Sequence, residues 1–275
     1  MLVSVVLNFQ TIRFAPGNDL PYILYLPTYA ATARYHNKLD ESDTQFESFM
    51  DEVRAFATGD YTVALMQGSA ITSDQRANIV RQLAKYTGLT PEYIERTDLR
   101  INIARFCKEL LRDEGRTVGR FDSRYKGIDR DSAGEMYEYD PSSAVTQGAY
   151  TATLNDYVRS ELEFESDLPY EILSRRVHPW DYGDHQNAYV NVADTLRASM
   201  TMNPALKVFV ANGYYDLATP FLASEYTFSH LGLDESLQDN ITTAYYQAGH
   251  MMYIDQAELR KMKDDLDAFL DDVLS

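Results

Sequence analysis

Hydrophobic residues form short continuous runs at the start of the chain and near its end, and these runs predict strands. Apart from Ser4, residues 2–7 are apolar, rich in β-branched side chains and closed by Asn8, which is typical of a strand buried on both faces of a parallel sheet. Residues 206–211 and 241–246 predict two more strands, with a helix over 220–231 between them and a closing helix after them. The closing helix is expected to bury Leu259, Met262, Leu266, Phe269, Leu270 and Val273. Strands that alternate with helices predict an α/β fold with a parallel sheet.

Between these strands, from about residue 20 to residue 200, the hydrophobic period is helical. Residues 44–58 carry apolar side chains at spacings of three and four, and Gly59 suits the end of that helix. Thr72 and Gln75 form a capping-box pattern for a helix that Gly88 can close. Thr90-Pro91 begins another helix. Further helices are expected around 101–111, 151–164 and 189–201, joined by polar loops, notably 113–148. Successive helices without a convincing strand predict an inserted helical cap.

Composition narrows the class of protein. The chain has 275 residues, 45% of them hydrophobic, which is enough for one substantial core. Its net charge of -17 opposes binding to nucleic acid or to anionic lipid. The apolar runs are far shorter than the roughly 20 residues of a membrane span, and the first residues do not read as a signal peptide. The single Cys107 excludes an intramolecular disulfide and a multi-cysteine zinc site within this chain, and it leaves the compartment open.

Two loops that follow predicted strands carry candidate catalytic residues. Asp216 lies in the loop 211–220 and His250 in the loop 248–252, at strand ends where open α/β sheets place their ligands. A histidine can take a proton from a serine hydroxyl, and a carboxylate on its other nitrogen holds the tautomer and stabilises the imidazolium. The alternative is that Asp216 caps the helix near Pro220 and that His250 is an ordinary loop histidine.

The segments Val208-Phe-Val-Ala-Asn-Gly-Tyr-Tyr-Asp-Leu-Ala-Thr-Pro220 and Tyr246-Gln-Ala-Gly-His-Met-Met252 resemble the C-terminal signature of serine carboxypeptidases, particularly of bacterial relatives. The similarity extends over the whole chain, including Asn8-Phe-Gln-Thr-Ile-Arg-Phe14 and Leu20-Pro-Tyr-Ile-Leu-Tyr-Leu-Pro27 after the first strand. The resemblance implies an α/β-hydrolase fold with a helical insertion, and peptides as substrates that lose their C-terminal residues. It implies that Asp216 orients His250, that His250 is the general base and acid, and that Met251 borders the pocket for the leaving residue. It implies no metal and no organic cofactor.

With this resemblance the chain divides into three parts: a core strand of the sheet over 1–19, a helical cap over 20–200, and a C-terminal core over 201–275 that holds the Asp and His loops. It is then the C-terminal part of an α/β-hydrolase.

The nucleophile departs from the family pattern. A nucleophile elbow needs Gly-x-Ser-x-Gly or a close relative, and no glycine of this chain is followed two places later by serine. Residues 115–119 fit with Thr117 in place of serine, but a charged amphipathic helix precedes them, so we interpret them as a loop. The resemblance places the serine upstream of Met1, together with the oxyanion-hole glycines and the groups that bind the terminal carboxylate of the substrate. We therefore expect the isolated chain to be inactive as a peptidase.

Other candidate residues have simpler interpretations. His178 and His185, with two carboxylates between them, could suggest a metal site, but Pro179 and Gly183 favour a turn. The spacing of Asp129, Asp131 and Gly134 resembles a calcium loop, yet Ala133 and Asp140 stand where ligands are needed. His36 is expected to pack or to lie on the surface, and His230 lies near a predicted helix end. The 21 tyrosines either line a cap pocket or pack in the core.

Two hypotheses about function follow. The first is an incomplete serine carboxypeptidase. The second is a non-enzymatic interaction module, in which a sheet edge with exposed apolar groups favours pairing or oligomerisation.

Overall fold

The structure is a computed structural model that describes residues 1–40, 44–172 and 174–274. Its centre is a parallel sheet with the strand order β1-β4-β5, formed by β1 (Leu2–Val3), β4 (Val208–Gly213) and β5 (Ile241–Tyr246). Leu2 is paired with Val210, and Val208 with Ile241. The mixed α/β class and the predicted parallel pair are confirmed, since β5 has its predicted bounds and β4 starts and ends two residues later than expected.

The first strand is shorter than predicted. The run 2–7 was expected to be one strand, but β1 ends at Val3 because Ser4 has a φ of 47°. The backbone of Ser4 still donates to the carbonyl of Ala211 at 2.9 Å. Its hydroxyl donates to the carbonyl of His250 at 2.7 Å. Long-range contacts at the edge of the sheet therefore hold the turn that ends the strand, which an apolar run alone could not predict.

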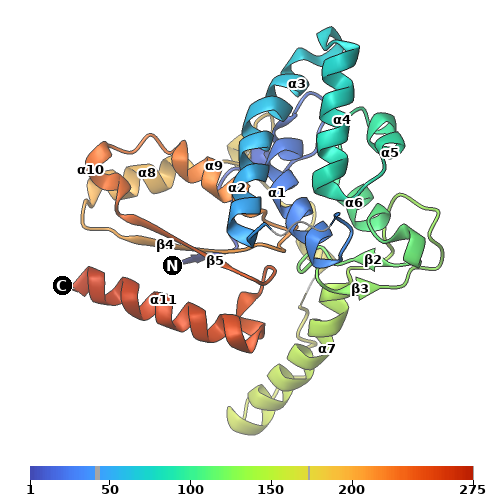
Figure 1. The fold of residues 1–275 in the computed structure, drawn as a ribbon. Coiled ribbons are helices and arrows are strands. Elements are labelled where there is room, and N and C mark those ends of the chain that lie inside the picture. The colour runs from blue at the N-terminus through green and yellow to red at the C-terminus, as the bar shows by residue number, and fades with distance from the viewer. Residues whose placement is uncertain (41–43, 173, 275) are drawn as a thin grey trace.

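Helices cover both faces of the sheet (Figure 1). Because successive side chains of a strand point to opposite faces, Phe209 and Ala211 pack on α11 (Gln256–Leu274). Val208 and Val210 face the other way and pack with Met200 of α8 (Ala193–Met202). The helix α9 (Phe221–Ser229) lies on this second side, with Phe228 in the same cluster, and α10 (Glu235–Gln238) follows it before β5.

The closing helix is less buried than predicted. Met262 of α11 is buried, and Leu266 and Phe269 pack partly against the sheet. Leu259, Leu270 and Val273 were expected in the core, but they are 40%, 49% and 39% exposed. One face of α11 meets the sheet, and its neighbouring apolar positions lie on the surface.

Six helices build a second, larger core above the sheet. They are α1 (Leu20–Tyr35), α2 (Phe46–Phe56), α3 (Thr62–Gln67), α4 (Ser73–Thr87), α5 (Pro91–Arg96) and α6 (Ile103–Glu109). α1 is apolar around most of its circumference and contacts α2, α4 and α9, as expected of a central helix.

Local capping signals in this region are confirmed. Thr72 and Gln75 form the capping box of α4, and Gly88 ends that helix with a φ of 67°. Thr90 caps α5, and Pro91 is its first residue. These signals were readable because both partners of each cap lie within a few residues of one another.

Three local predictions in the helical region were wrong. Gly59 does not end a helix, because residues 57–61 form a π-helical turn that leads into α3. The expected loop 113–148 contains a small antiparallel pair, β2 (Thr117–Val118) and β3 (Lys126–Gly127). The helix expected over 151–164 begins ten residues too late in that prediction: α7 (Pro141–Asp156) starts where Asp140 caps it through the amide of Ser142 at 3.0 Å, and a π-helical turn over Tyr157–Glu161 continues it.

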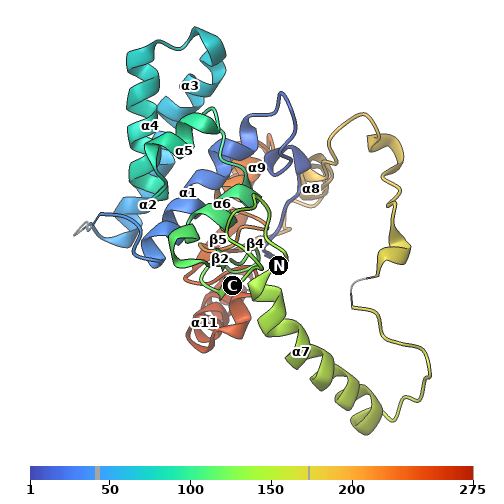
Figure 2. The ribbon, with the colours of Figure 1, turned by 90° about the vertical axis from the view of Figure 1, so that its right-hand side faces the viewer.

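α7 extends away from the rest of the molecule, and the described residues between α7 and α8 follow a wide path at its side (Figure 2). This path returns to the sheet region through backbone hydrogen bonds of residues 7–9 with residues 190–192. Phe9 donates to Val190, and Val192 donates to Leu7, each at 2.8 Å. In the described parts of the chain, no helix has both the length and the apolar character that crossing a bilayer requires.

Candidate active site

The Asp and His loops leave neighbouring parallel strands and stay hydrogen-bonded beyond them. Tyr214 donates to the carbonyl of Tyr246, and Tyr215 donates to that of Ala248, each at 3.0 Å. Gly213 permits this approach, because a Cβ atom at that position would lie 2.3 Å from the carbonyl oxygen of Gly249. The two loops therefore form one continuous edge at the carboxyl ends of β4 and β5.

The carboxylate of Asp216 is fully buried and accepts four hydrogen bonds. Oδ1 accepts from the backbone amides of Ala218 and Thr219 at 2.8 and 2.9 Å. Oδ2 accepts from the hydroxyl of Thr219 at 2.5 Å and from Nδ1 of His250 at 2.9 Å. These four contacts use the whole accepting capacity of an ionised carboxylate, so the charge is held in one orientation.

The ring of His250 is oriented by this carboxylate, as predicted from the two loops. Both hydrogen-bond contacts of the ring in the described structure are made by Nδ1, one to Asp216 and one at 3.3 Å to Oγ1 of Thr219. The side chain remains 29% exposed. An Nδ1–H bond to Asp216 selects the tautomer whose Nε2 carries a lone pair, which is the form that can accept a proton.

The alternative, in which Asp216 caps the following helix, is wrong. α9 begins at Phe221 with Pro220 at its N-cap, and no side chain caps it. Asp216 instead accepts hydrogen bonds from the amides of Ala218 and Thr219, which stabilises the loop before the helix. Thr219 is a member of the site that the sequence interpretation missed, although it lies within the recognised signature.

A third segment, residues 120–124, lies against both loops, and the sequence did not reveal it. The amide of Leu217 donates to the carbonyl of Arg120, and the amide of His250 donates to that of Phe121, at 3.0 and 2.6 Å. The Phe121 ring also contacts the His250 ring, with centroids 5.0 Å apart. The segment falls in the predicted loop 113–148, and its partners are about a hundred residues away, so no local pattern could identify it.

Two charged side chains of this segment reach the His loop. Asp122 accepts from the amide of Gly249 at 3.2 Å. Arg124 binds Asp122 and also donates through Nη1 to the carbonyl of Gln247 at 2.7 Å and to Asp255 at 3.3 Å. Burial is the largest single effect on the pKa of the Arg124 guanidinium and lowers it, but the hydrogen bonds and charges of Asp122 and Asp255 together outweigh burial and raise the pKa.

His36 lies against the same segment, residues 120–124. Its Nε2 lies 2.7 Å from the carbonyl oxygen of Ser123. Burial lowers the pKa of His36, against the opposing effect of this hydrogen bond. Of the two expectations for His36, packing or a place on the surface, the structure shows a partly buried, packed ring, whereas His230 is an exposed residue at the end of α9 whose Nδ1 contacts the Tyr226 carbonyl at 2.7 Å.

Met251, expected to border the leaving-residue pocket, is half-buried and follows His250 directly in the chain. Its carbonyl accepts from Ile254 at 3.1 Å and starts the short turn of residues 252–254. The binding role of Met251 remains a prediction.

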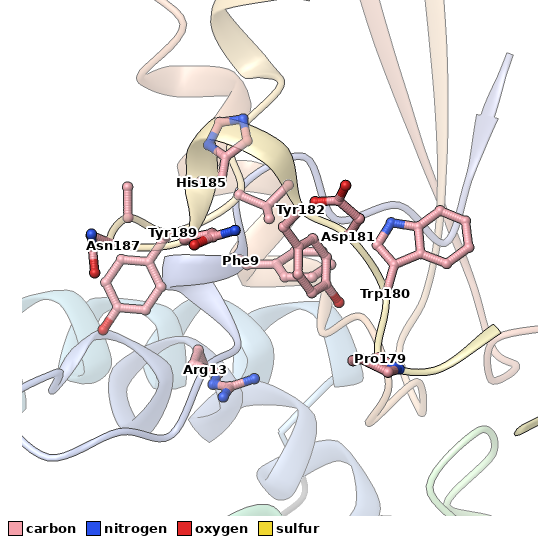
Figure 3. Close-up of a pocket in the computed structure, with 12 residues that line it drawn as sticks. Phe9, Arg13, Pro179, Trp180, Asp181, Tyr182, His185, Asn187 and Tyr189 are labelled. Carbon is pink, nitrogen blue, oxygen red and sulfur yellow. The ribbon is translucent and has the colours of Figure 1, made fainter. Parts of the chain in front are cut away.

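A hollow of about 850 Å³ lies elsewhere, beyond the residues that follow β1. In Figure 3 the rings of Phe9 and Tyr182 approach one another, with Arg13 below them and Trp180 to one side. The Phe9 and Tyr182 centroids are 6.4 Å apart. Neither Asp216 nor His250 lines this hollow.

The other sequence candidates have structural explanations. His178 is exposed, and the neighbouring residues 183–185 form a short turn, as expected. Asp129 forms a buried ion pair with Lys108, which takes the place that a calcium ion would need. Within the described ranges no group of three or more His, Cys, Asp and Glu side chains is placed to hold a metal ion.

Thr117, the residue at the centre of the Gly-x-Thr-x-Gly pattern, is buried in β2 and donates to the carbonyl of Cys107 at 3.0 Å. The interpretation of residues 115–119 as a loop was therefore wrong at Thr117 and Val118. The buried hydroxyl is bonded to the backbone and is not presented as a nucleophile.

The arrangement can accept and return a proton at Nε2 of His250, with Asp216 stabilising the charged ring. Comparisons of the chain with family models, with curated proteins and with solved structures found no match to any of them.

Proposed function

We propose that this chain supplies the acid–base pair of a serine carboxypeptidase with an α/β-hydrolase fold, and that the nucleophilic serine comes from a segment outside residues 1–275. The observation that carries the proposal is the bond of 2.9 Å between Nδ1 of His250 and the buried carboxylate of Asp216, at the ends of neighbouring parallel strands.

In this proposal His250 takes the proton of the serine hydroxyl at Nε2 while the serine attacks the last peptide bond of the substrate. The imidazolium then gives that proton to the leaving amine, and the carboxylate of Asp216 stabilises the charged ring in between. Water repeats the cycle on the acyl-enzyme and releases the shortened peptide. The groups that this chain contributes need no metal and no organic cofactor for these steps.

The topology supports the proposal. In an α/β-hydrolase the acid and the base follow the serine in chain order, and here Asp216 follows β4 and His250 follows β5. The residues between β1 and β4 are mainly helical, which agrees with a cap inserted into a sheet.

The serines of this chain do not supply the nucleophile in this proposal. Ser4 is the serine bonded to the His loop, but its hydroxyl donates to the carbonyl oxygen of His250 and not to the ring. Val5 and Val6 follow it, where an elbow needs a small residue and the start of a helix.

The test is to join the chain to the coding sequence that lies upstream of the Met1 codon and to assay carboxypeptidase activity. We expect activity, and a loss of about 10⁶ in kcat for His250→Ala, with a loss on the order of 10⁴ for Asp216→Ala. His230→Ala, which alters an exposed histidine at the end of α9, is the matched control and should keep full activity. An active enzyme that lost little on His250→Ala would place the base elsewhere.

The isolated chain gives a second test. It should react with a serine-directed phosphonate no faster than denatured protein does, because its serines lack an elbow and an oxyanion hole. Specific labelling of one serine in the native chain would contradict the proposal.

The alternative function, an interaction module, is favoured by two features of the surface. The exposed apolar side chains of α11, namely Leu259, Leu270 and Val273, lie outside the core, and β1 and β5 are edge strands of the small sheet. Unpaired strand edges and exposed apolar groups favour association. A stop codon and a ribosome-binding signal directly before Met1 would support this alternative, and an open frame encoding an elbow would exclude it.

A further inference from the structure

We propose that Asp122 and Arg124 are positioning residues for His250, holding the His loop at the place where its ring meets Asp216. We call these two side chains, with their bonds to residues 247–255, the clasp. The inference rests on the proposed function for its catalytic meaning, but the placement of the ring can be measured without any activity.

The clasp lies in the segment 120–124, called the clasp segment, which binds the backbone of the His loop at several neighbouring positions. Arg124 donates to the carbonyl of Gln247 at 2.7 Å, and Asp122 accepts from the amide of Gly249 at 3.2 Å. The next amide, that of His250, donates to the carbonyl of Phe121 at 2.6 Å. The backbone on the N-terminal side of the catalytic ring is therefore bound to one short segment, while the ring itself is bound to Asp216.

Close contact makes this attachment specific. A Cβ atom on Gly249 would lie 2.4 Å from the carbonyl oxygen of Phe121 and 2.5 Å from Cβ of Asp122. The glycine before the histidine is thus required because the clasp segment lies directly against it, and the other side of the loop faces Gly213. The His loop is enclosed between β4 and the clasp.

The guanidinium of Arg124 is well suited to this role. Its planar fork binds the carboxylate of Asp122 with Nε and Nη2, at 3.0 and 2.7 Å to the nearer oxygens, and leaves Nη1 for Gln247 and Asp255. It also lies over the Tyr215 ring, 5.6 Å from the centroid. A lysine has one point charge and no fork, so it cannot make these contacts together.

Positioning matters here because the bond to Asp216 fixes only one atom of the ring. A shift of the His loop by about 1 Å would lengthen that bond and misplace Nε2, and errors of this size cost catalysts about 10²-fold. Side chains that orient a catalytic ligand from behind have comparable effects in other sites. The clasp is the described feature that opposes such a shift on the side of the loop away from β4.

The experiment measures the tautomer of His250 by ¹⁵N NMR of the imidazole in the isolated chain at alkaline pH. The wild-type chain should show mainly the Nδ1–H form that donates to Asp216. In Arg124→Gln this form should decrease in favour of Nε2–H, and the Gly249 and His250 amides should exchange at least about tenfold faster, as expected for losing a hydrogen bond to a charged group. Arg124→Lys should give an intermediate result.

Arg116→Gln is the matched control. It removes the same charge from an exposed arginine, whose side chain donates to the carbonyl of Gly115, and should leave the tautomer and both exchange rates unchanged. If Arg124→Gln does not fold, Asp255→Ala is the substitute variant. It removes one acceptor of the Arg124 guanidinium, so Arg124 should be held less firmly and the tautomer should shift in the same direction.

A double variant separates positioning from general stability. Asp122→Asn with Arg124→Gln leaves no buried charge unpaired, so its free energy of unfolding should recover toward the wild type, while the tautomer should stay shifted. Recovery of the tautomer together with stability would overturn the proposal, and so would an unchanged tautomer in a folded Arg124→Gln chain. If the chain joined to its upstream segment proves inactive while the tautomer shifts as expected, the proposed function is wrong, and the positioning role of Asp122 and Arg124 is still supported.

Discussion

At the scale of single residues, the carboxylate of Asp216 combines a structural and a chemical task. Burial of a charge is costly unless hydrogen bonds replace the lost water, and Ala218 and Thr219 provide three such bonds within the same loop. Only one accepting position then remains for His250. The bonds from Ala218 and Thr219 lie within the Asp loop, so they hold the carboxylate in its orientation independently of the His loop.

Thr219 offers a direct test of this division. We expect Thr219→Val to lower the free energy of unfolding by about 1–3 kcal/mol, because Oδ2 of Asp216 loses a donor in a buried place. Thr219→Ser keeps the hydroxyl and serves as control, with a much smaller loss. Urea unfolding of both variants measures the difference, and equal losses would show that the hydroxyl bond is unimportant.

His36 makes stability depend on pH. Burial lowers its pKa in the folded chain, so the unfolded chain, with an ordinary histidine pKa of about 6.5, binds the proton more readily. Stability should therefore fall as the pH decreases below about 6.5, toward the lowered pKa of the folded state. The slope should be smaller in His36→Gln, as followed by urea unfolding at several pH values, and an identical slope in that variant would assign the effect to other groups.

At the scale of elements, the sequence could predict what depends on neighbouring residues. The bounds of β5 and the caps at Thr72 and Thr90 follow from patterns a few residues long. The turn at Ser4 was not predictable, because its partners are Ala211 and His250. For α7 a local signal did exist, because Asp140 before Pro141 is an N-cap residue followed by a proline in the first turn of the helix.

The same contrast applies to the candidate site. Asp216 and His250 were predictable because each follows a recognisable strand and because their chemistry requires a partner. The residues 120–124 were not predictable, because their backbone and side chains bind loops that lie about a hundred residues further along the chain. A pattern in one segment carries no information on which distant segment will cover it.

The two sides of α11 should respond differently to truncation. Met262→Ala removes a buried side chain between the helix and the sheet, and we expect it to cost about 2–5 kcal/mol of stability. Leu270→Ala shortens a side chain that is 49% exposed, and its effect should stay within about 0.5 kcal/mol. Thermal or urea unfolding compares the two, and a large loss for Leu270→Ala in dilute solution would mean that this side chain is covered.

At the scale of the whole molecule, charge and apolar surface oppose one another. The net charge of -17 keeps copies of the chain apart, whereas the exposed apolar residues of α11 favour contact. Salt screens the repulsion over about 10 Å at 0.1 M and about 3 Å at 1 M. The strength of association should therefore depend on ionic strength.

Sedimentation velocity tests this expectation. The average mass of the isolated chain should rise with salt concentration, and Leu270→Glu should reduce that rise because it places a charge on the apolar face of α11. Association that weakened with salt would identify ion pairs, and not apolar contact, as its cause.

The clasp also determines when the site can form during synthesis. The carbonyl of Gln247 comes 123 residues after Arg124, and the amide of Gly249 comes 127 residues after Asp122. A chain that grows at about 5–20 residues per second needs several seconds to make that stretch. Throughout this time Arg124 can pair with Asp122 but not with the His loop, which does not yet exist. The residues of α1–α6 have all been made by then, so the bonds between the clasp and the His loop are distant contacts, of the slow kind that close a fold rather than start it.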